Sequence, residues 1–169
     1  VNKETNEFVK IEAPSEKEFQ QKKHRKTTLS EDEFYDSFEN IDVKNNIRDF
    51  LTYANTNMGL ELKWNVASVS VKLKDGDQLL TLFLIDSKTG EFHVGWLNDQ
   101  LRKMGHDPEI ALRMWKLISD LFDNVQLKQK DNSTIGLSRN ISFSEFSDKS
   151  DKIKEIIEET ISNIKELSF

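Results

Sequence analysis

Residues 60–96 read LELKWNVASVSVKLKDGDQLLTLFLIDSKTGEFHVGW, and apolar side chains alternate with polar ones along most of this stretch. A period of two is typical of strands that bury one face. Polar turn sequences at 74–77 and 86–90 divide the stretch, so the pattern predicts an antiparallel meander of three or four strands. Residues 79–85 are apolar nearly throughout, and we expect them to form a central strand with both faces covered.

Helical signals begin before the meander. Ser30 and Glu33 have the spacing of a capping box, in which each side chain can hydrogen-bond the backbone of the other residue. A helix is therefore predicted to start there. The apolar pattern weakens at residues 40–42, resumes at helical spacing over 43–58 and ends at Gly59, a residue that favours helix termination.

Further elements are predicted after the meander. They are a short helix, a long helix, a second hairpin and a final helix, at 97–104, 108–122, 125–130 with 134–143, and 150–167. In the long helix, Met114, Leu117 and Ile118 are expected to point inward. The predicted fold class is α+β, an antiparallel β-meander covered by amphipathic helices.

The length and composition suit one domain. With 169 residues, we expect residues 1–28 to be a flexible arm or the end of an upstream domain, and 29–169 to form a single α+β domain. No apolar run approaches the roughly 20 residues of a membrane-spanning helix, so we expect no membrane contact and a cytoplasmic location. Cysteine is absent, which excludes disulfides, thiolate metal sites and cysteine nucleophiles.

Three residues match the active-site motif of the PD-(D/E)xK nucleases. In those enzymes two carboxylates, here Asp77 and Asp86, hold a divalent metal, and a lysine, here Lys88, helps to activate water. Residues 78–85, however, are predicted to form one strand, which at about 3.3 Å per residue separates the carboxylates by roughly 30 Å. No catalytic site is therefore expected, and Asp77, Asp86 and Lys88 with Mg²⁺ remain the alternative.

Four residues are candidates to face a ligand. His93 lies beside Gly95, where a ligand or a backbone could come close, and Trp96 follows on the same predicted strand. Arg113 flanks Trp115, which falls off the expected apolar stripe of its helix and could be exposed. The alternative is a solvent-facing histidine with tryptophans packed in the core. The three histidines lie far apart in the sequence, so no metal site and no cofactor are predicted.

A basic cluster precedes the first predicted helix. Its cations, Lys22, Lys23, Arg25 and Lys26, could contact a phosphate backbone, which gives affinity without sequence information. The net charge of the chain is -6 and acidic residues follow the cluster directly, so the alternative is an ordinary solvated linker.

The order of the elements in the first half of the chain resembles that of one region in a group of bacterial proteins. A Lys/Arg-rich segment, a capped Ser-Glu-Asp-Glu-Phe helix start, a helix ending near Gly59 and strands around residues 60–64 resemble the region that follows PD-(D/E)xK nuclease-like domains in uncharacterised bacterial proteins. The resemblance covers about residues 8–97. It implies an accessory module, with residues 1–14 as the tail of the upstream domain and a catalytic domain elsewhere in the same full-length protein.

The leading hypothesis is a non-catalytic binding or accessory domain of a bacterial nucleic-acid-processing or defence protein. Its partner is expected to be nucleic acid or a protein, because no acid–base, nucleophile or metal arrangement satisfies the spacing that such chemistry needs. Two alternatives stay open. One is the divergent metal-dependent nuclease, and the other is a self-association module in which the isoleucine stripe of residues 150–167 joins copies into an oligomer.

Overall fold

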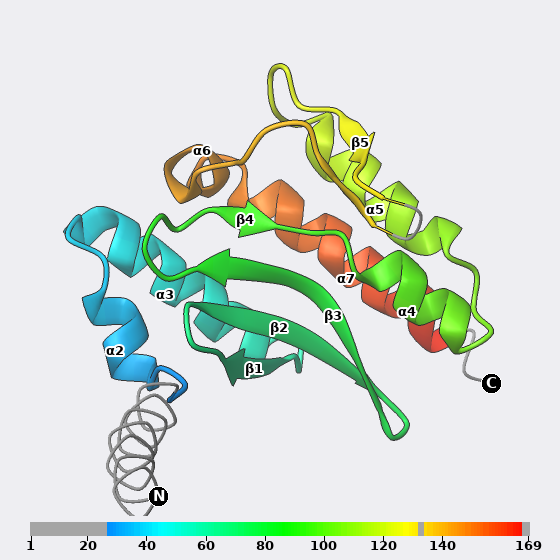
Figure 1. Ribbon diagram of the computed structural model, residues 1–169, viewed down its shortest axis with the longest axis horizontal. Helices are drawn as coiled ribbons and strands as arrows, with labels where there is room; N and C mark the ends of the chain where they lie inside the picture. Colours follow the sequence, from blue (N-terminus) through cyan, green and yellow to red (C-terminus); the bar gives the residue numbers. More distant parts are fainter. Residues whose placement is uncertain (1–26, 132–133, 167–169) are drawn as a thin grey trace, which may run out of the picture.

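A computed structural model describes residues 27–131 and 134–166 of the chain (Figure 1). Lys22, Lys23, Arg25 and Lys26 lie outside the described residues. The elements follow one another as α2 (Glu31–Asp36), α3 (Ile41–Thr56), β1 (Glu61–Trp64), β2 (Ser68–Asp75), β3 (Gln78–Asp86), β4 (Phe92–His93), α4 (Leu97–Lys103), α5 (Glu109–Ser119), β5 (Leu127–Gln129), β6 (Ile135–Leu137), α6 (Phe143–Ser147) and α7 (Ser150–Glu166).

The predicted meander is present and the α+β class is confirmed. Strands β1 to β4 pair antiparallel in sequence order, and β5 and β6 form a separate two-stranded sheet. Asp75 pairs with Gln78 across the tight β2–β3 turn, where Gly76 adopts φ +61°. This left-handed conformation explains why glycine stands at the predicted turn. Strand β4 has only two residues, so it is shorter than the alternation over 92–96 suggested.

A β-bulge explains the continuous apolar run in β3. Val71 pairs with Phe83 but Lys72 pairs with Thr81, which leaves Leu82 as the extra residue. Leu82 and Phe83 are consecutive, yet both are fully buried in the same core. The expectation that residues 79–85 are covered on both faces is therefore wrong at its start, because Leu79 is 41% exposed.

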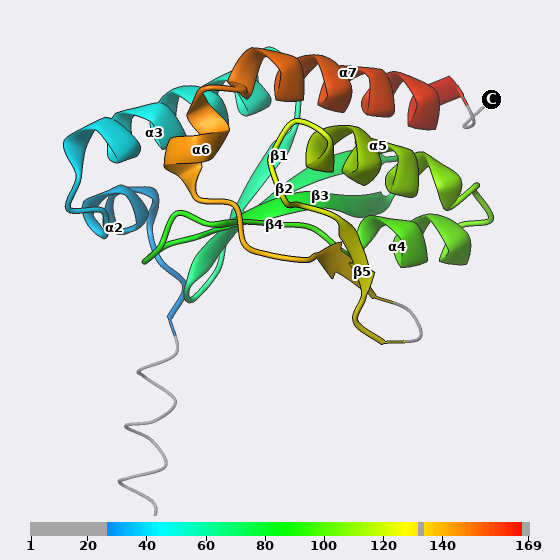
Figure 2. The same ribbon diagram turned by 90° about the horizontal axis from the view of Figure 1, so that it is seen from above.

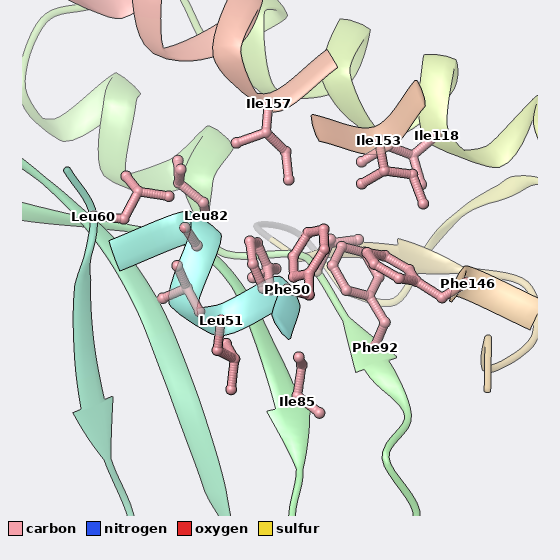
Figure 3. Close-up of a cluster of buried hydrophobic side chains, with 14 of the residues drawn as sticks. Phe50, Leu51, Leu60, Leu82, Ile85, Phe92, Ile118, Phe146, Ile153 and Ile157 are labelled. Atoms are coloured by element: carbon pink, nitrogen blue, oxygen red, sulfur yellow. The ribbon is translucent and has the colours of Figure 1, made fainter. Parts of the chain in front are cut away.

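The helices gather on one side of the sheet. Figure 2 shows α3, α5, α6 and α7 on that side, and in Figure 1 α3 and α7 pass behind the strands. Aromatic rings fill much of the layer between them: Phe50 of α3 lies 4.8 Å from Phe146 of α6 and 5.8 Å from Phe83 of β3, measured between ring centroids. Figure 3 shows this cluster with Ile153 and Ile157 of α7 above it. No described helix covers the opposite face of the sheet.

The isoleucine stripe of α7 belongs to this core. Ile153, Ile157 and Ile164 are fully buried, and Ile161 is nearly so. The stripe is therefore used within the fold, and the self-association hypothesis is wrong about the surface that would join two copies.

Helix α4 closes the edge of β3 that the short β4 leaves uncovered. The side-chain oxygen Oε1 of Gln100 accepts a hydrogen bond of 2.7 Å from the backbone N–H of Thr81. An unpaired N–H on a strand edge is a point where a foreign strand can add. The side chain of Gln100 accepts the hydrogen bond of this N–H from within the same molecule, so the donor is not free to pair with another strand.

Two stretches differ from the sequence prediction because side chains cap new helices. The second hairpin ends at Leu137 rather than at residue 143, and helix α6 begins after Ser142, whose hydroxyl accepts from Glu145 N while the Glu145 carboxylate accepts from Ser142 N. Near the start of the chain, Asn40 accepts hydrogen bonds from the backbone of the first turn of α3. The residues between 30 and 58 therefore form two helices.

Candidate functional site

The helix-free face of the sheet carries a row of side chains that crosses all four strands. Lys63 pairs with Ser70, Ser70 with Leu84, and Leu84 with His93. Directly paired residues on antiparallel strands point to the same face. The row therefore runs from the exposed Lys63 on β1 to the half-buried His93 on β4 and spans about 14 Å, from three strand spacings of ~4.8 Å.

Two more lysines stand on this face. Lys72 and Lys74 follow Ser70 at intervals of two along β2, so their side chains share its side of the sheet. Burial lowers the pKa of the Lys72 ammonium, and the nearby positive charge of Lys63 lowers it further. A partly desolvated ammonium beside another cation gains from an anion that approaches the pair. We call Lys63, Lys72 and Lys74 with the row from Ser70 to His93 the open face.

A groove continues the open face beyond β4. It is a hollow of about 190 Å³ between β4 and the β5–β6 hairpin. Its lining includes an imidazole, an indole, two cationic side chains and an amide, contributed by His93, Trp96, Lys130, Arg139 and Asn140. The structure thus brings together His93 and Trp96, two of the predicted ligand-facing residues. The Trp96 side chain is 39% exposed.

Two glycines shape the groove. Gly95 adopts φ +140°, and a β-carbon there would lie 2.5 Å from the carbonyl oxygen of Ile135. The close approach expected beside His93 is therefore made by the backbone of β6. At Gly136 a β-carbon would lie 2.8 Å from Cε of Lys130, so the lysine stem rests across this residue. Glycine at position 95 lets the backbone of β6 approach the end of β4, and glycine at position 136 leaves room for the Lys130 side chain over β6.

Most charges around the groove are already paired. Arg139 donates to both carboxylate oxygens of Glu145, at 3.1 and 3.0 Å, and also to the carbonyl oxygen of Asp123. Glu91 accepts from the amide of Asn140 at 2.8 Å and lies 3.9 Å from His93. Within residues 27–131 and 134–166, no carboxylate forms an ion pair with Lys130. Lys130 is therefore the groove cation placed to meet an anionic ligand.

The nuclease-like residues are not brought together. Asp77 lies in the β2–β3 turn and Asp86 at the far end of β3. Asp86 Oδ1 accepts from the backbone N–H groups of Lys88 and Thr89 and from the Thr89 hydroxyl. Burial raises the pKa of Asp86, but these hydrogen bonds outweigh it and the net shift is downward. The Asp86 carboxylate thus organises the β3–β4 turn.

In the part of the chain that the structure describes, no three histidine, aspartate or glutamate side chains lie together in a way that could hold a metal ion. His106 and Asp75 form a half-buried pair, with Nε2 and Oδ2 3.4 Å apart, that joins the β2–β3 turn to the loop after α4. The arrangement of two residues from distant segments suits a structural contact.

The prediction that Trp115 could face a ligand is wrong. Its side chain is fully buried in the core, whereas Leu117, which was expected to point inward, is 36% exposed. Trp115 follows Ala111 by four residues and precedes Ile118 by three, so it lies on the buried side of α5. Arg113 is on the surface and pairs with Glu159 of α7 at 3.1 Å. Neither residue lines the groove of Trp96.

Sequence reasoning missed the lysines of the site. Lys63, Lys72 and Lys74 occupy polar positions of the period-two pattern, so their common face could have been found once the strand register was assumed. Lys130 gives no such signal, because its position beside Trp96 depends on how the β5–β6 hairpin packs against β4.

Comparison with protein-family models, curated proteins and solved structures finds no match for this chain. Among the described helices, none combines the length and the apolar composition needed to cross a bilayer.

Proposed function

We propose that this domain is a non-catalytic binding domain that holds nucleic acid against the open face. The observation that carries the proposal is the gathering of Lys63, Lys72 and Lys74 on the side of the sheet that no described helix covers. In this proposal the domain is a cytoplasmic accessory module of a bacterial nucleic-acid-processing or defence protein, with a catalytic domain elsewhere in the full-length protein.

The distribution of charge supports a phosphate ligand. Exposed carboxylates lie along α7 on the other side of the molecule, including Glu155, Glu158 and Glu159. The chain is acidic overall, and Glu61 pairs with Lys72 and points to the same side of the sheet. The three lysines outnumber this carboxylate, so an approaching polyanion still meets net positive charge on the open face. Lysine contacts with phosphates release counterions, so such binding weakens as salt rises. The negative field of the α7 carboxylates disfavours binding of a polyanion to the α7 side of the domain.

The place where the chain enters the domain also supports the proposal. The N–H of Leu29 donates to the carbonyl oxygen of Asn65, directly after β1. Lys22, Lys23, Arg25 and Lys26 precede Leu29 by only a few residues in sequence. We therefore include this basic cluster in the proposed nucleic-acid contact and test it separately from the open face.

The test is filter binding of single-stranded and double-stranded DNA and RNA at two salt concentrations. The variant Lys63→Gln/Lys74→Gln removes two exposed charges from the open face and should weaken binding and reduce the salt slope by roughly one unit for each lost phosphate contact. Lys152→Gln/Lys165→Gln makes the same charge change on exposed positions of α7 and should bind as the unaltered protein does.

Two results would refute the proposal. One is no binding by the unaltered protein at low salt, and the other is an equal loss in the α7 control, which would show a response to net charge alone. Replacing Lys22, Lys23, Arg25 and Lys26 by Gln measures the contribution of the basic cluster. Mg²⁺-dependent cleavage that disappears in Asp86→Ala would instead support the nuclease alternative.

A further inference from the structure

Trp96 differs from the other two tryptophans in its surroundings. Trp115 is fully buried, and Trp64 packs against Phe34 and Tyr35 with ring centroids 5.3 and 6.0 Å away. The Trp96 indole is 39% exposed and lines the groove at the end of the row that starts at Lys63. An exposed indole inside a concave, partly charged groove is a surface on which a planar ring can stack.

The size of the groove limits what it can hold. Its volume of about 190 Å³ is below the ~300–1,000 Å³ typical of sites that enclose a whole small-molecule ligand. The groove is also continuous with the open face through His93, which belongs to both. It therefore suits one ring of a longer ligand whose remainder lies on the sheet.

The charges of the groove favour a ring that is linked to an anion. Lys130 rests across Gly136 and lines the same hollow as Trp96. The other cation, Arg139, is held by Glu145 and by the carbonyl oxygen of Asp123. The groove thus pairs an indole with an ammonium, which matches a base and its neighbouring phosphate.

We propose that the groove stacks one base of a single-stranded nucleic acid on Trp96 while Lys130 contacts the adjacent phosphate. This inference rests on the proposed function and adds a preference for single strands. In a duplex both faces of each internal base are already stacked and its pairing edge is engaged, so the base cannot enter the groove unless it leaves the helix. A single strand offers free base faces at no such cost.

The experiment compares the affinity of the full chain for a single-stranded 12-nucleotide DNA and for a duplex of the same sequence. Trp96→Ala should lower single-strand affinity about ten-fold or more, the effect of losing one stacked base, and leave duplex affinity unchanged. Trp96→Phe keeps an aromatic face and should retain most of the affinity. Leu117→Ala is the matched control, because Leu117 lies on α5, outside the groove and the open face, and is similarly exposed, at 36%.

The outcomes separate this inference from the function on which it rests. If the unaltered protein binds and Lys63→Gln/Lys74→Gln weakens binding, but Trp96→Ala does not lower single-strand affinity, the proposed function stands and the stacking site is refuted. Equal losses of single-strand and duplex affinity in Trp96→Ala also refute it. If the unaltered protein binds neither DNA at low salt, both proposals fail. Unchanged urea unfolding of Trp96→Ala and Trp96→Phe confirms that these variants are folded.

Discussion

Gly95 lies so close to Ile135 that a β-carbon on the glycine would stand 2.5 Å from the isoleucine carbonyl oxygen. The two residues belong to segments about forty positions apart, and their contact sets the distance between the end of β4 and the β5–β6 hairpin. The width of the groove lined by Trp96 and Lys130 therefore depends on the absence of a β-carbon at Gly95.

Gly95→Ala should destabilise the protein by more than about 2 kcal/mol, because the clash with Ile135 adds to the roughly 1–2 kcal/mol cost of a left-handed backbone. Gly59→Ala is the matched control: Gly59 also has a positive φ, +71°, but a β-carbon there would meet no atom within 4 Å. It should show only the backbone cost. Urea unfolding measures both, and equal losses would contradict the close contact.

Truncation of the buried Trp115 and of the partly exposed Trp96 should change the free energy of unfolding by different amounts. Trp115→Ala leaves a cavity in the core between α5 and its neighbours and should cost about 3–5 kcal/mol of unfolding free energy. Trp96→Ala removes a partly exposed ring and should change that free energy by under about 1 kcal/mol. Denaturant titration of both variants provides the comparison, and a large loss in Trp96→Ala would show that this ring supports the fold.

Replacing Asp86 should loosen the β3–β4 turn. Asp86→Ala removes the acceptor of hydrogen bonds from Lys88 and Thr89 and should cost about 1.5–3 kcal/mol, the range for hydrogen bonds to a charged group. Asp86→Asn keeps an acceptor oxygen and should lose less. Thermal or urea unfolding at pH 7 measures the difference, and the absence of any loss in Asp86→Ala would show that the turn forms without this carboxylate.

The same carboxylate should make stability depend on pH in the acidic range. The pKa of Asp86 is lower in the folded protein than its unfolded value of about 3.9. Its contribution is therefore fully present above that value and is lost as the pH falls through the lower folded pKa. In Asp86→Asn the decline in unfolding free energy below about pH 4 should be smaller than in the unaltered protein. Equal declines would show that other carboxylates cause it.

Glu145 should add to this acid sensitivity at the start of α6. The hydrogen bonds from Arg139 lower the pKa of Glu145, against the opposing effect of burial, and Ser142 adds to the lowering. The stabilisation is present above the unfolded pKa of about 4.3 and is lost as the pH falls through the folded value. Glu145→Gln should lower the urea midpoint of unfolding at pH 7. The difference between the midpoints at pH 7 and pH 3 should be smaller in this variant than in the unaltered protein. A variant with the unaltered midpoint at pH 7 would contradict a stabilising role.

The meander could be predicted because alternation and turn chemistry act locally. Residues 74–77 carry the glycine that the tight turn needs, and the polar positions on β2 point to one face. The bulge at Leu82 could not be predicted, because it depends on how two strands align rather than on either strand alone. The pattern of β3 therefore suggested two covered faces where the structure buries two consecutive residues in one core.

Other features of the fold do have a signal in the sequence. Ser142 and Glu145 have the same capping-box spacing as Ser30 and Glu33, and this spacing marks the start of α6. The charged neighbours of Trp115 suggest a surface position, whereas its spacing from Ile118 fits the buried side of α5, where the structure places it. The groove itself needs the packing of the β5–β6 hairpin against β4, which no local pattern specifies.

The hydrogen bond from Thr81 N–H to Gln100 affects whether separate copies of the protein can aggregate through the edge of β3. An unoccupied strand margin is where misfolded copies commonly join and extend into fibres. At this point of β3 an incoming chain finds the amide already engaged by a side chain of α4. The hydrogen bond thereby prevents this edge of β3 from acting as a template for polymer growth. The lysines of the open face stay accessible.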